Sequence, residues 1–332
     1  MSNDNLINAK KAKNDEFYTQ LSDIEKELSH YPIETFKDKV VYCPCDSTDY
    51  SNGYISNFAI YFYKNFKSLG LKKLLCSCYS DGINYYEYNG INEFESHRGN
   101  GDFRSEYYTN LLAEADIVVT NPPFSLFRDF VKWLVDADKK FIILGNQNAI
   151  TYKEVFPLIK NNKLWIGSQK AIFRQTFFET TYPVDTESAK KEIARKFSKE
   201  FLSEHNMTAV TGICWFTNID INKRHDKLIG LSMQDLIDKG VKFPKYDNYD
   251  AIEVSKVKEI PLDYDGVMGV PITFLYQYCP DQFEILGCSC KYGKIAEHID
   301  GTPYNCLINC KACYARIFIR HRKDENDLSS DT

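Results

Sequence analysis

Short apolar runs alternate with stretches of helical spacing through the first half of the chain. Buried strands are predicted at residues 39–43, 73–78, 116–120, 141–144 and 164–166. Helices are predicted at residues 22–29, 55–66, in the segment that ends at 111–115, and at 126–135 and 152–159. Strands that alternate with helices are typical of βαβ units. The pattern therefore predicts an α/β fold with a doubly wound, mostly parallel sheet.

The alternation stops near residue 167. The stretch 168–208 carries several cationic side chains: Arg174, Lys190, Lys191, Arg195, Lys196 and Lys199. The apolar run 209–216 predicts one more strand, and residues 218–322, with more Pro, Gly and Tyr, are typical of an α+β region. We expect a first domain over 1–217 with a basic insertion at about 168–208, a second region over 218–322, and a disordered tail over 323–332. Residues 1–14 form a polar leader in this interpretation.

The motif Asn121-Pro122-Pro123-Phe124 directly follows the strand at 116–120. Ligands of doubly wound sheets bind at the carboxyl ends of the strands. The exocyclic amine of adenine is a poor nucleophile because its lone pair is delocalised into the ring. The side-chain oxygen of Asn121 and the carbonyl of Pro122 can each accept one amine hydrogen, which favours a pyramidal, nucleophilic nitrogen.

The other two residues suit the same chemistry. Consecutive prolines stiffen the loop, and Phe124 offers a flat face on which an extruded base can stack. The alternative is that Asn-Pro-Pro is only a turn. Because the motif stands at the exit of a buried strand in a βαβ chain, we favour methyl transfer to an amine.

The chain resembles the EcoRI-type family of adenine-specific DNA methyltransferases. The segments that carry the resemblance are DEFYTQ (15–20), VVYCPCD (40–46), GDFRS (101–105), DIVVTNPPFSLFR (116–128), ITYKEVF (150–156), PKYDNYDAI (244–252) and PLDYDGVMGVPITFL (261–275). They follow the order of the family over nearly the whole chain. The resemblance implies a Rossmann-like fold that depends on S-adenosylmethionine (SAM), an α+β DNA-recognition region in the second half, and methylation of the N6 amine of a flipped adenine.

The resemblance also implies where SAM binds. Phe17, Tyr18 and Thr19 would form an N-terminal element that packs on SAM, although a staple at a helix start is the alternative. Pro44, Cys45 and Asp46 form the turn after the first strand, which lacks the usual glycines, and Asp46 would face the amino-acid end of SAM. Tyr79 would pack on the adenosine. Asp102 and Phe103 match the pair that holds the SAM adenine, although Asp102 in a plain turn is the alternative. No metal is expected to take part in the chemistry.

Cysteines near the carboxyl end raise a separate question. Cys306, Cys310 and Cys313 have the spacing of an iron-sulfur motif, but they stand too late in the chain for a radical SAM enzyme. A structural zinc held by four of Cys288, Cys290, His298, Cys306, Cys310 and Cys313 is the second interpretation. The irregular spacing favours the third, ordinary reduced cysteines.

The composition limits which partners the protein can bind and where in the cell it is expected. The formal net charge is -5, so binding to duplex DNA would need a local basic surface. Candidate phosphate contacts are Lys190, Lys191, Arg195, Lys196, Lys223, Arg224 and Lys227. For any single lysine among them, an ordinary solvated helix face is the alternative. Eleven cysteines, no apolar signal segment and no long apolar run predict a cytoplasmic protein of a bacterium or phage, without membrane contact.

Two other functions stay open. Asn-Pro-Pro-aromatic motifs also serve methyltransferases that act on RNA amines or on protein glutamine, although the C-terminal segments favour DNA. A SAM-fold protein that binds DNA without catalysis is disfavoured by the intact motif. As a DNA methyltransferase, the protein would act as a monomer. It would be the modification enzyme of a restriction-modification system, with a cognate endonuclease that shares its site without a stable complex, or an orphan or phage equivalent.

Overall fold

The structure, a computed structural model, describes residues 18–46, 55–78, 83–91, 95–98, 102–168, 176–179, 187–289, 306–313 and 315–322. The chain forms two compact units. Unit 1 comprises Met1–Ala149 and Ile166–Ile219, and unit 2 comprises Ile150–Trp165 and Asp220–Thr332. The division expected from sequence, at residue 217, keeps residues 150–165 in the first domain. In the structure these residues belong to unit 2, where the helix α7 (Phe156–Lys160) contacts the strand β14 (Phe283–Cys288).

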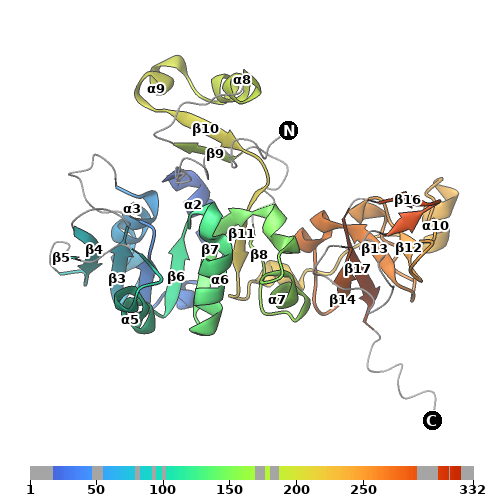
Figure 1. The fold of residues 1–332 in the computed structure, drawn as a ribbon, viewed down its shortest axis with the longest axis horizontal. Helices are drawn as coiled ribbons and strands as arrows, with labels where there is room; N and C mark the ends of the chain where they lie inside the picture. Colours follow the sequence, from blue (N-terminus) through green and yellow to red (C-terminus); the bar gives the residue numbers. More distant parts are fainter. Residues whose placement is uncertain are drawn as a thin grey trace, which may run out of the picture. The chain divides into compact units, whose positions relative to one another are not determined.

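Unit 1 is built on an eight-stranded sheet (Figure 1). In spatial order its strands are β5 (Glu95–Arg98), β4 (Ile83–Tyr88), β3 (Lys73–Ser77), β2 (Val40–Cys43), β6 (Ile117–Thr120), β7 (Lys140–Asn146), β11 (Ile213–Thr217) and β8 (Trp165–Ile166). The pairs β2–β3, β2–β6 and β6–β7 are parallel, whereas β4 runs antiparallel to β3 and β5, and β11 runs antiparallel to β7. The predicted mostly parallel, Rossmann-like α/β fold is confirmed.

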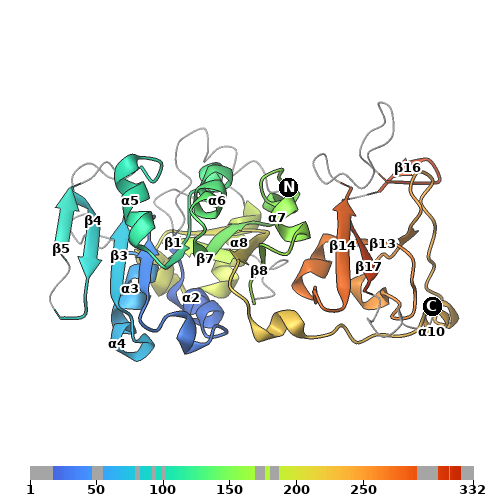
Figure 2. The same ribbon diagram turned by 90° about the horizontal axis from the view of Figure 1, so that it is seen from below.

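Helices cover both faces of this sheet. They are α2 (Leu21–Leu28), α3 (Asn57–Lys64), α4 (Phe66–Leu69), α5 (Glu106–Glu114) and α6 (Phe127–Asp136). Figure 2 shows α5 and α6 on one face, and α2, α3 and α4 on the other. The central strands β2 and β6 are buried along their whole length, as expected for strands covered on both sides. The core therefore lies between the sheet and these two layers.

The helices follow from local signals in the sequence. The side chain of Ser56 caps α3 by accepting a hydrogen bond from the backbone N–H of Phe58 at 3.2 Å. The helix α6 buries Phe127, Phe130, Val131 and Leu134, which recur at helical spacing, against the sheet. These two helices frame the strand ends at which ligands of such folds bind.

The prediction of a single strand over 209–216 is wrong. The chain forms β10 (Met207–Val210), turns at Gly212, and continues as β11. Gly212 has a φ of 74°, a conformation that side chains disfavour, so the extended run is interrupted there. The two strands belong to different sheets. The hairpin of β4 and β5 was not predicted from the sequence either.

A small antiparallel sheet adds to unit 1. It has the order β1 (Tyr18–Thr19), β9 (Thr176–Glu179) and β10. The helix α8 (Glu187–Lys196) packs on β10 through its buried residues Ala189 and Ile193, and α9 (Lys199–Glu204) follows. The predicted basic insertion thus contributes β9, α8, α9 and the first half of β10 among the described residues.

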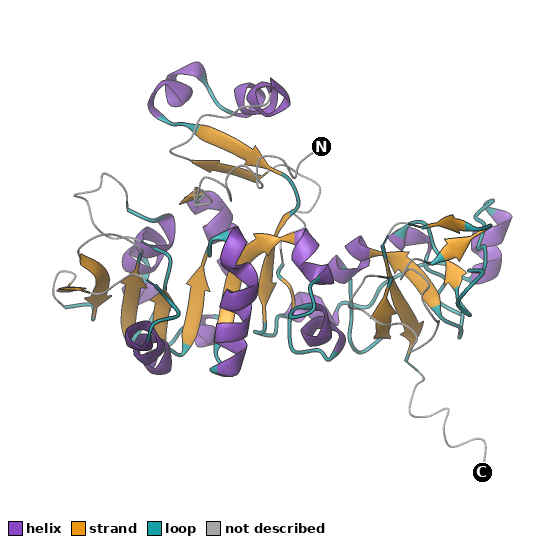
Figure 3. Cartoon of the chain, in the orientation of Figure 1, coloured by secondary structure: helices purple, strands orange, loops and turns teal. Residues whose placement is uncertain are grey.

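Unit 2 is an α+β unit with more loop and less helix than unit 1 (Figure 3). Its four-stranded sheet has the order β12 (Ile252–Glu253), β13 (Met268–Pro271), β17 (Arg316–His321) and β14. The strands β15 (Leu307–Ile308) and β16 (Lys311–Ala312) form a separate pair, and α10 (Met233–Asp238) is a short helix. Short 3-10 helices in the described part of residues 220–332 are Asn222–His225, Val257–Glu259 and Ile272–Tyr276. Among the described residues of both units, no helix has the length and apolarity needed to cross a membrane.

Candidate active site at the carboxyl ends of β2 and β6

The site lies where the order of the sheet reverses. From β2 the chain moves to β3 on one side, and from β6, on the other side of β2, it moves away to β7. Ligands of doubly wound sheets bind in the crevice at such a reversal. Asp46 follows β2 and Asn121 follows β6, so the fold brings two of the predicted site residues to this position.

Asn121 is held by the small sheet. Its Nδ2 donates a hydrogen bond to Oγ1 of Thr19 on β1 at 3.2 Å. Thr19 is itself buried, with 4% of its surface exposed, and its carbonyl oxygen accepts a hydrogen bond from Nδ2 of Asn57 at 2.8 Å. The amide of Asn121 is therefore anchored through its nitrogen, which directs Oδ1 away from Thr19.

Asp46 is a buried carboxyl group that joins two elements. Thr120 donates from Oγ1 to its Oδ2 at 2.6 Å, and Ser56 donates from Oγ to its Oδ1. Only 4% of Asp46 is exposed, and this burial raises the pKa of the carboxyl to about 7, against the opposing effect of the two hydroxyl donors. Asp46 thus fixes the residue that precedes Asn121 to the residue that caps α3.

The turn after β2 is fixed to the end of β3. The backbone N–H of Asp46 donates to the carbonyl oxygen of Ser77 at 2.7 Å, and Oγ of Ser77 donates to the carbonyl oxygen of Pro44 at 3.2 Å. These two hydrogen bonds fix the turn, which lacks the usual glycines. Cys45 is half-buried in this turn.

Pro122, Pro123 and Phe124 connect β6 to α6. Pro122 is buried, and the 3-10 turn Phe124–Leu126 closes when the backbone N–H of Leu126 donates to the carbonyl oxygen of Pro123 at 2.9 Å. Phe124 is half-buried at the start of this turn. The short, closed turn keeps the motif at the carboxyl end of β6.

Asp102 and Phe103 have partners within unit 1. Arg104 binds both oxygens of Asp102, with Nε at 2.9 Å from Oδ1 and Nη2 at 2.8 Å from Oδ2. These bonds lower the pKa of Asp102, so its carboxylate is ionised. Phe103 is buried against Phe130 and Trp133 of α6, with ring centroids 5.1 and 5.3 Å away. Phe103 is therefore part of an aromatic cluster in the core.

Some predicted site residues cannot be placed. Phe17 and Tyr79 lie outside the described residues, and of Tyr18 only the backbone, in β1, is described. Three residues that contribute to the site were missed: Ser56, Asn57 and Thr120. Ser56 carries the signal of a helix cap, and Thr120 the signal of a polar side chain in a buried strand.

The cysteines of unit 2 form no metal site among the residues that the structure describes. Cys306 is a buried free thiol, Cys313 is half-buried and Cys310 is exposed. Cys288, buried at the end of β14, is disulfide-bonded, so the expectation of reduced cysteines is wrong at this position. No group of three metal-ligating side chains gathers in the described part of the chain. Cys290 and His298 lie outside it, so the suggested zinc stays an untested alternative.

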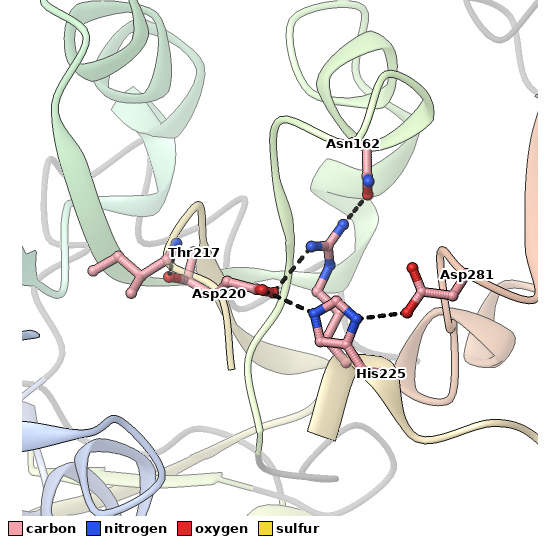
Figure 4. A network of polar contacts seen from close by, with 7 residues as sticks. Asn162, Thr217, Asp220, His225 and Asp281 are labelled. Atoms are coloured by element: carbon pink, nitrogen blue, oxygen red, sulfur yellow. Dashed lines mark hydrogen bonds and ion pairs between the residues drawn. The ribbon is translucent and has the colours of Figure 1, made fainter. Parts of the chain in front are cut away.

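The side chain of Arg224 is engaged in contacts with other residues of unit 2. Its guanidinium lies 3.8 Å from the ring centre of Trp165 and donates to Asp220 at 3.1 Å and to Asn162, and only 9% of its side chain is exposed. Figure 4 shows the polar contacts around Asp220, among which His225 lies between Asp220 and Asp281, at 2.8 and 2.6 Å. These contacts argue against Arg224 as a phosphate contact. On α8, by contrast, Lys190, Lys191, Arg195 and Lys196 are exposed.

Comparison with known proteins identifies the family. A sequence model described as "Adenine-specific methyltransferase EcoRI" matches residues 5–97 and 82–322. The chain belongs to this family. It is 42% identical to type II methyltransferase M.EcoRI of Escherichia coli, over 96% of each chain. It is 43% identical to type II methyltransferase M.MpnI of Mycoplasma pneumoniae and 36% identical to M.MgeORF184P of Mycoplasma genitalium, over 84% of each chain in both cases. No solved structure matches the chain.

Membership of this family confirms the predicted enzyme class, a methyltransferase, and implies SAM as the methyl donor. The donor set at the strand ends fits such a ligand. Asp46 supplies a carboxyl group at the end of β2, and a cationic ligand beside this buried group would favour its ionised form. Each carboxylate oxygen has two lone pairs, so the hydroxyl donors of Asp46 leave it acceptor capacity.

Proposed function

We propose that the protein is a site-specific DNA methyltransferase that methylates the N6 amine of an adenine flipped out of the duplex. The observation that carries this proposal is the Asn121 amide, which stands at the reversal point of the sheet and is anchored through its nitrogen to Thr19. An amide held in this way presents its oxygen as an acceptor. That is the group needed to withdraw one hydrogen of an aromatic amine from the plane of the ring.

Catalysis then rests on orientation. Oδ1 of Asn121 and the carbonyl oxygen of Pro122 accept one hydrogen each from the adenine amine, and the lone pair of the nitrogen becomes available for attack. Phe124 stacks on the flipped base. SAM would supply an electrophilic methyl group on a sulfonium, and Asn121 and Pro122 would orient the amine that receives this group and gives up one proton. In this proposal Phe17, Tyr18, Thr19, Pro44, Cys45, Asp46, Tyr79, Asp102 and Phe103 form the SAM site.

Duplex DNA is the proposed substrate because the relatives are named type II methyltransferases and match 84% or more of the chain. Unit 2 would supply target recognition, and the cations of α8 would contact phosphates. The enzyme would act as a monomer. It would serve a restriction-modification system, beside an endonuclease that shares its site, or act as an orphan or phage equivalent.

The substrate class can be tested directly. Transfer of labelled methyl from SAM to unmethylated duplex DNA, followed by nucleoside analysis, should yield N6-methyladenine, and sequencing of the modified positions would give the target site. RNA and glutamine-containing protein substrates, assayed in parallel, should stay unlabelled. Label in RNA or protein but not in DNA would overturn the DNA assignment and leave the fold and family unaffected.

The catalytic assignment predicts the behaviour of one variant. Asn121→Ala removes the acceptor, and we expect turnover to fall about a hundredfold or more while SAM affinity is largely retained. Asn65→Ala is a matched control, since the side chain of Asn65 donates to the Tyr61 carbonyl and accepts from Oγ of Ser68, both local contacts between α3 and α4. Near-full activity of Asn121→Ala in the DNA assay would refute the assignment.

A further inference from the structure

The residues around Asn121 form a closed ring of hydrogen bonds. Asn121 donates to the side chain of Thr19, and Asn57 donates to the carbonyl oxygen of Thr19. Ser56, the neighbour of Asn57, donates to Asp46, and Asp46 also accepts from Thr120, the neighbour of Asn121. The ring therefore returns to its starting point through two peptide bonds.

The ring joins segments that are distant in sequence. Thr19 and Asn121 are 102 residues apart, Asp46 and Thr120 are 74 apart, and Thr19 and Asn57 are 38 apart. Thr19, Asp46, Ser56 and Thr120 are all buried. Inside a protein such hydrogen bonds are strong and costly to leave unmade, so a closed ring restricts each member to one orientation.

We propose that Thr19 is a positioning residue for the catalytic amide. The proposal rests on the proposed function, because it requires Asn121 to bind the substrate amine. A primary amide has one donor end and one acceptor end. Because Thr19 accepts from the nitrogen, the amide cannot turn over without losing this bond, and the oxygen stays on the side opposite β1.

The role differs from that of a cofactor contact. A residue that only binds SAM affects the affinity for SAM, whereas a positioning residue affects the rate of methyl transfer in the fully bound enzyme. The backbone of Thr19 is held separately, by Asn57 and by pairing with Phe178 on β9. A change of its side chain should therefore leave β1 in place.

The test uses two substitutions of Thr19 in the full-length enzyme. Thr19→Val keeps the shape and removes the acceptor, and Thr19→Ser restores a hydroxyl. We expect the single-turnover rate at saturating SAM and DNA to fall about tenfold to a hundredfold in Thr19→Val, and to stay within about threefold in Thr19→Ser. SAM affinity is measured separately by equilibrium dialysis, because Thr19 is also part of the proposed SAM site, and saturating SAM keeps any change in that affinity out of the measured rate.

Thr217→Val is the matched control for the loss of a buried hydroxyl. Thr217 lies on β11 and accepts from the backbone N–H of Ile219 at 3.0 Å, away from the ring. The single-turnover rate of the Thr217→Val variant should be unchanged even if its thermal unfolding temperature falls. This control separates a general loss of stability from a loss of positioning.

A double-mutant cycle decides whether Thr19 acts through Asn121. In the Asn121→Ala background, Thr19→Val should cause no further loss of rate, since no amide remains to be positioned. A wild-type rate in Thr19→Val, an additive loss in the double variant, or a loss confined to SAM affinity would overturn the proposal. If Asn121→Ala itself stays active, the proposed function fails instead, so the two failures are distinguishable.

Discussion

At the scale of single residues, Asp46 shows how a site can depend on a buried charge. Its carboxyl receives two hydroxyl donors but lies almost wholly out of water. Burial penalises the charged form more than the two hydrogen bonds favour it, and the pKa rises to about 7. In the absence of a cationic ligand, Asp46 therefore titrates near neutral pH.

This raised pKa predicts a pH-dependent stability. Between about pH 4 and pH 7 the folded chain keeps a proton on Asp46 that the unfolded chain has lost, so the stabilising contribution is lost as the pH rises through 7. We expect the stability advantage of the wild type over Asp46→Asn to shrink by roughly 2 to 3 kcal/mol from pH 5 to pH 8. Urea unfolding of both proteins at the two pH values measures the difference. An advantage that stays constant or grows would contradict the raised pKa.

At the scale of elements, Gly212 determines how one apolar run is divided. The run from 209 to 216 has the composition of a single strand, yet its two halves pair in different sheets. The turn requires a positive φ at Gly212, and the carbonyl of this residue accepts from the backbone N–H of Gln147 at 2.6 Å. The small sheet that holds Thr19 is thus connected to the main sheet by this turn.

Substitutions at Gly212 should report backbone strain alone. A Cβ atom there would lie 3.9 Å from its nearest neighbours, so space is available. Gly212→Ala should lower the free energy of unfolding by about 1 kcal/mol, because alanine disfavours a positive φ. Gly212→Asn should cost less, since asparagine tolerates this conformation better. Equal stability of all three proteins in urea unfolding would show that the turn relaxes.

At the scale of the whole molecule, the net charge of -5 opposes binding to a polyanion. DNA affinity must then come from local cations. On α8, Lys190 lies 3.3 Å from Glu187, Arg195 lies 2.6 Å from Glu192, and the ammonium of Lys196 lies 5.4 Å from the ring centre of Phe177, whereas Lys191 is exposed. Lys191 is therefore the first candidate on this helix for a phosphate contact.

Salt dependence tests this candidate surface. Replacement of Lys191 by Gln should weaken DNA binding and lower the slope of log affinity against log salt by about 1, since one phosphate contact is lost. Lys67→Gln on α4, an exposed lysine of unit 1 outside α8, is the control and should leave the slope unchanged. Titrations at several salt concentrations with a DNA duplex provide the measurement. An unaltered slope for Lys191→Gln would exclude this contact.

The sequence by itself determined the parallel strands of the main sheet and the place of the Asn121 motif. Buried strands and amphipathic helices leave periodic apolar patterns, so β2, β3, β6, β7 and their helices were predicted within a few residues. The position of Asn121 directly after β6 can also be recognised from neighbouring residues in the sequence. The family resemblance likewise rests on sequence segments and requires no knowledge of tertiary contacts. Local patterns are visible because they depend only on neighbours along the chain.

Only the tertiary structure decided which side chains meet. The bonds from Asn121 to Thr19 and from Thr120 to Asp46 join residues 102 and 74 positions apart, and no local pattern specifies such pairs. The same limit explains why Gly212 divides a run of strand-forming residues, why residues 150–165 join unit 2, and why Phe103 lies in an aromatic cluster. Burial and pairing are properties of the folded chain, and they give a hydroxyl or a carboxyl its role only when distant segments come together.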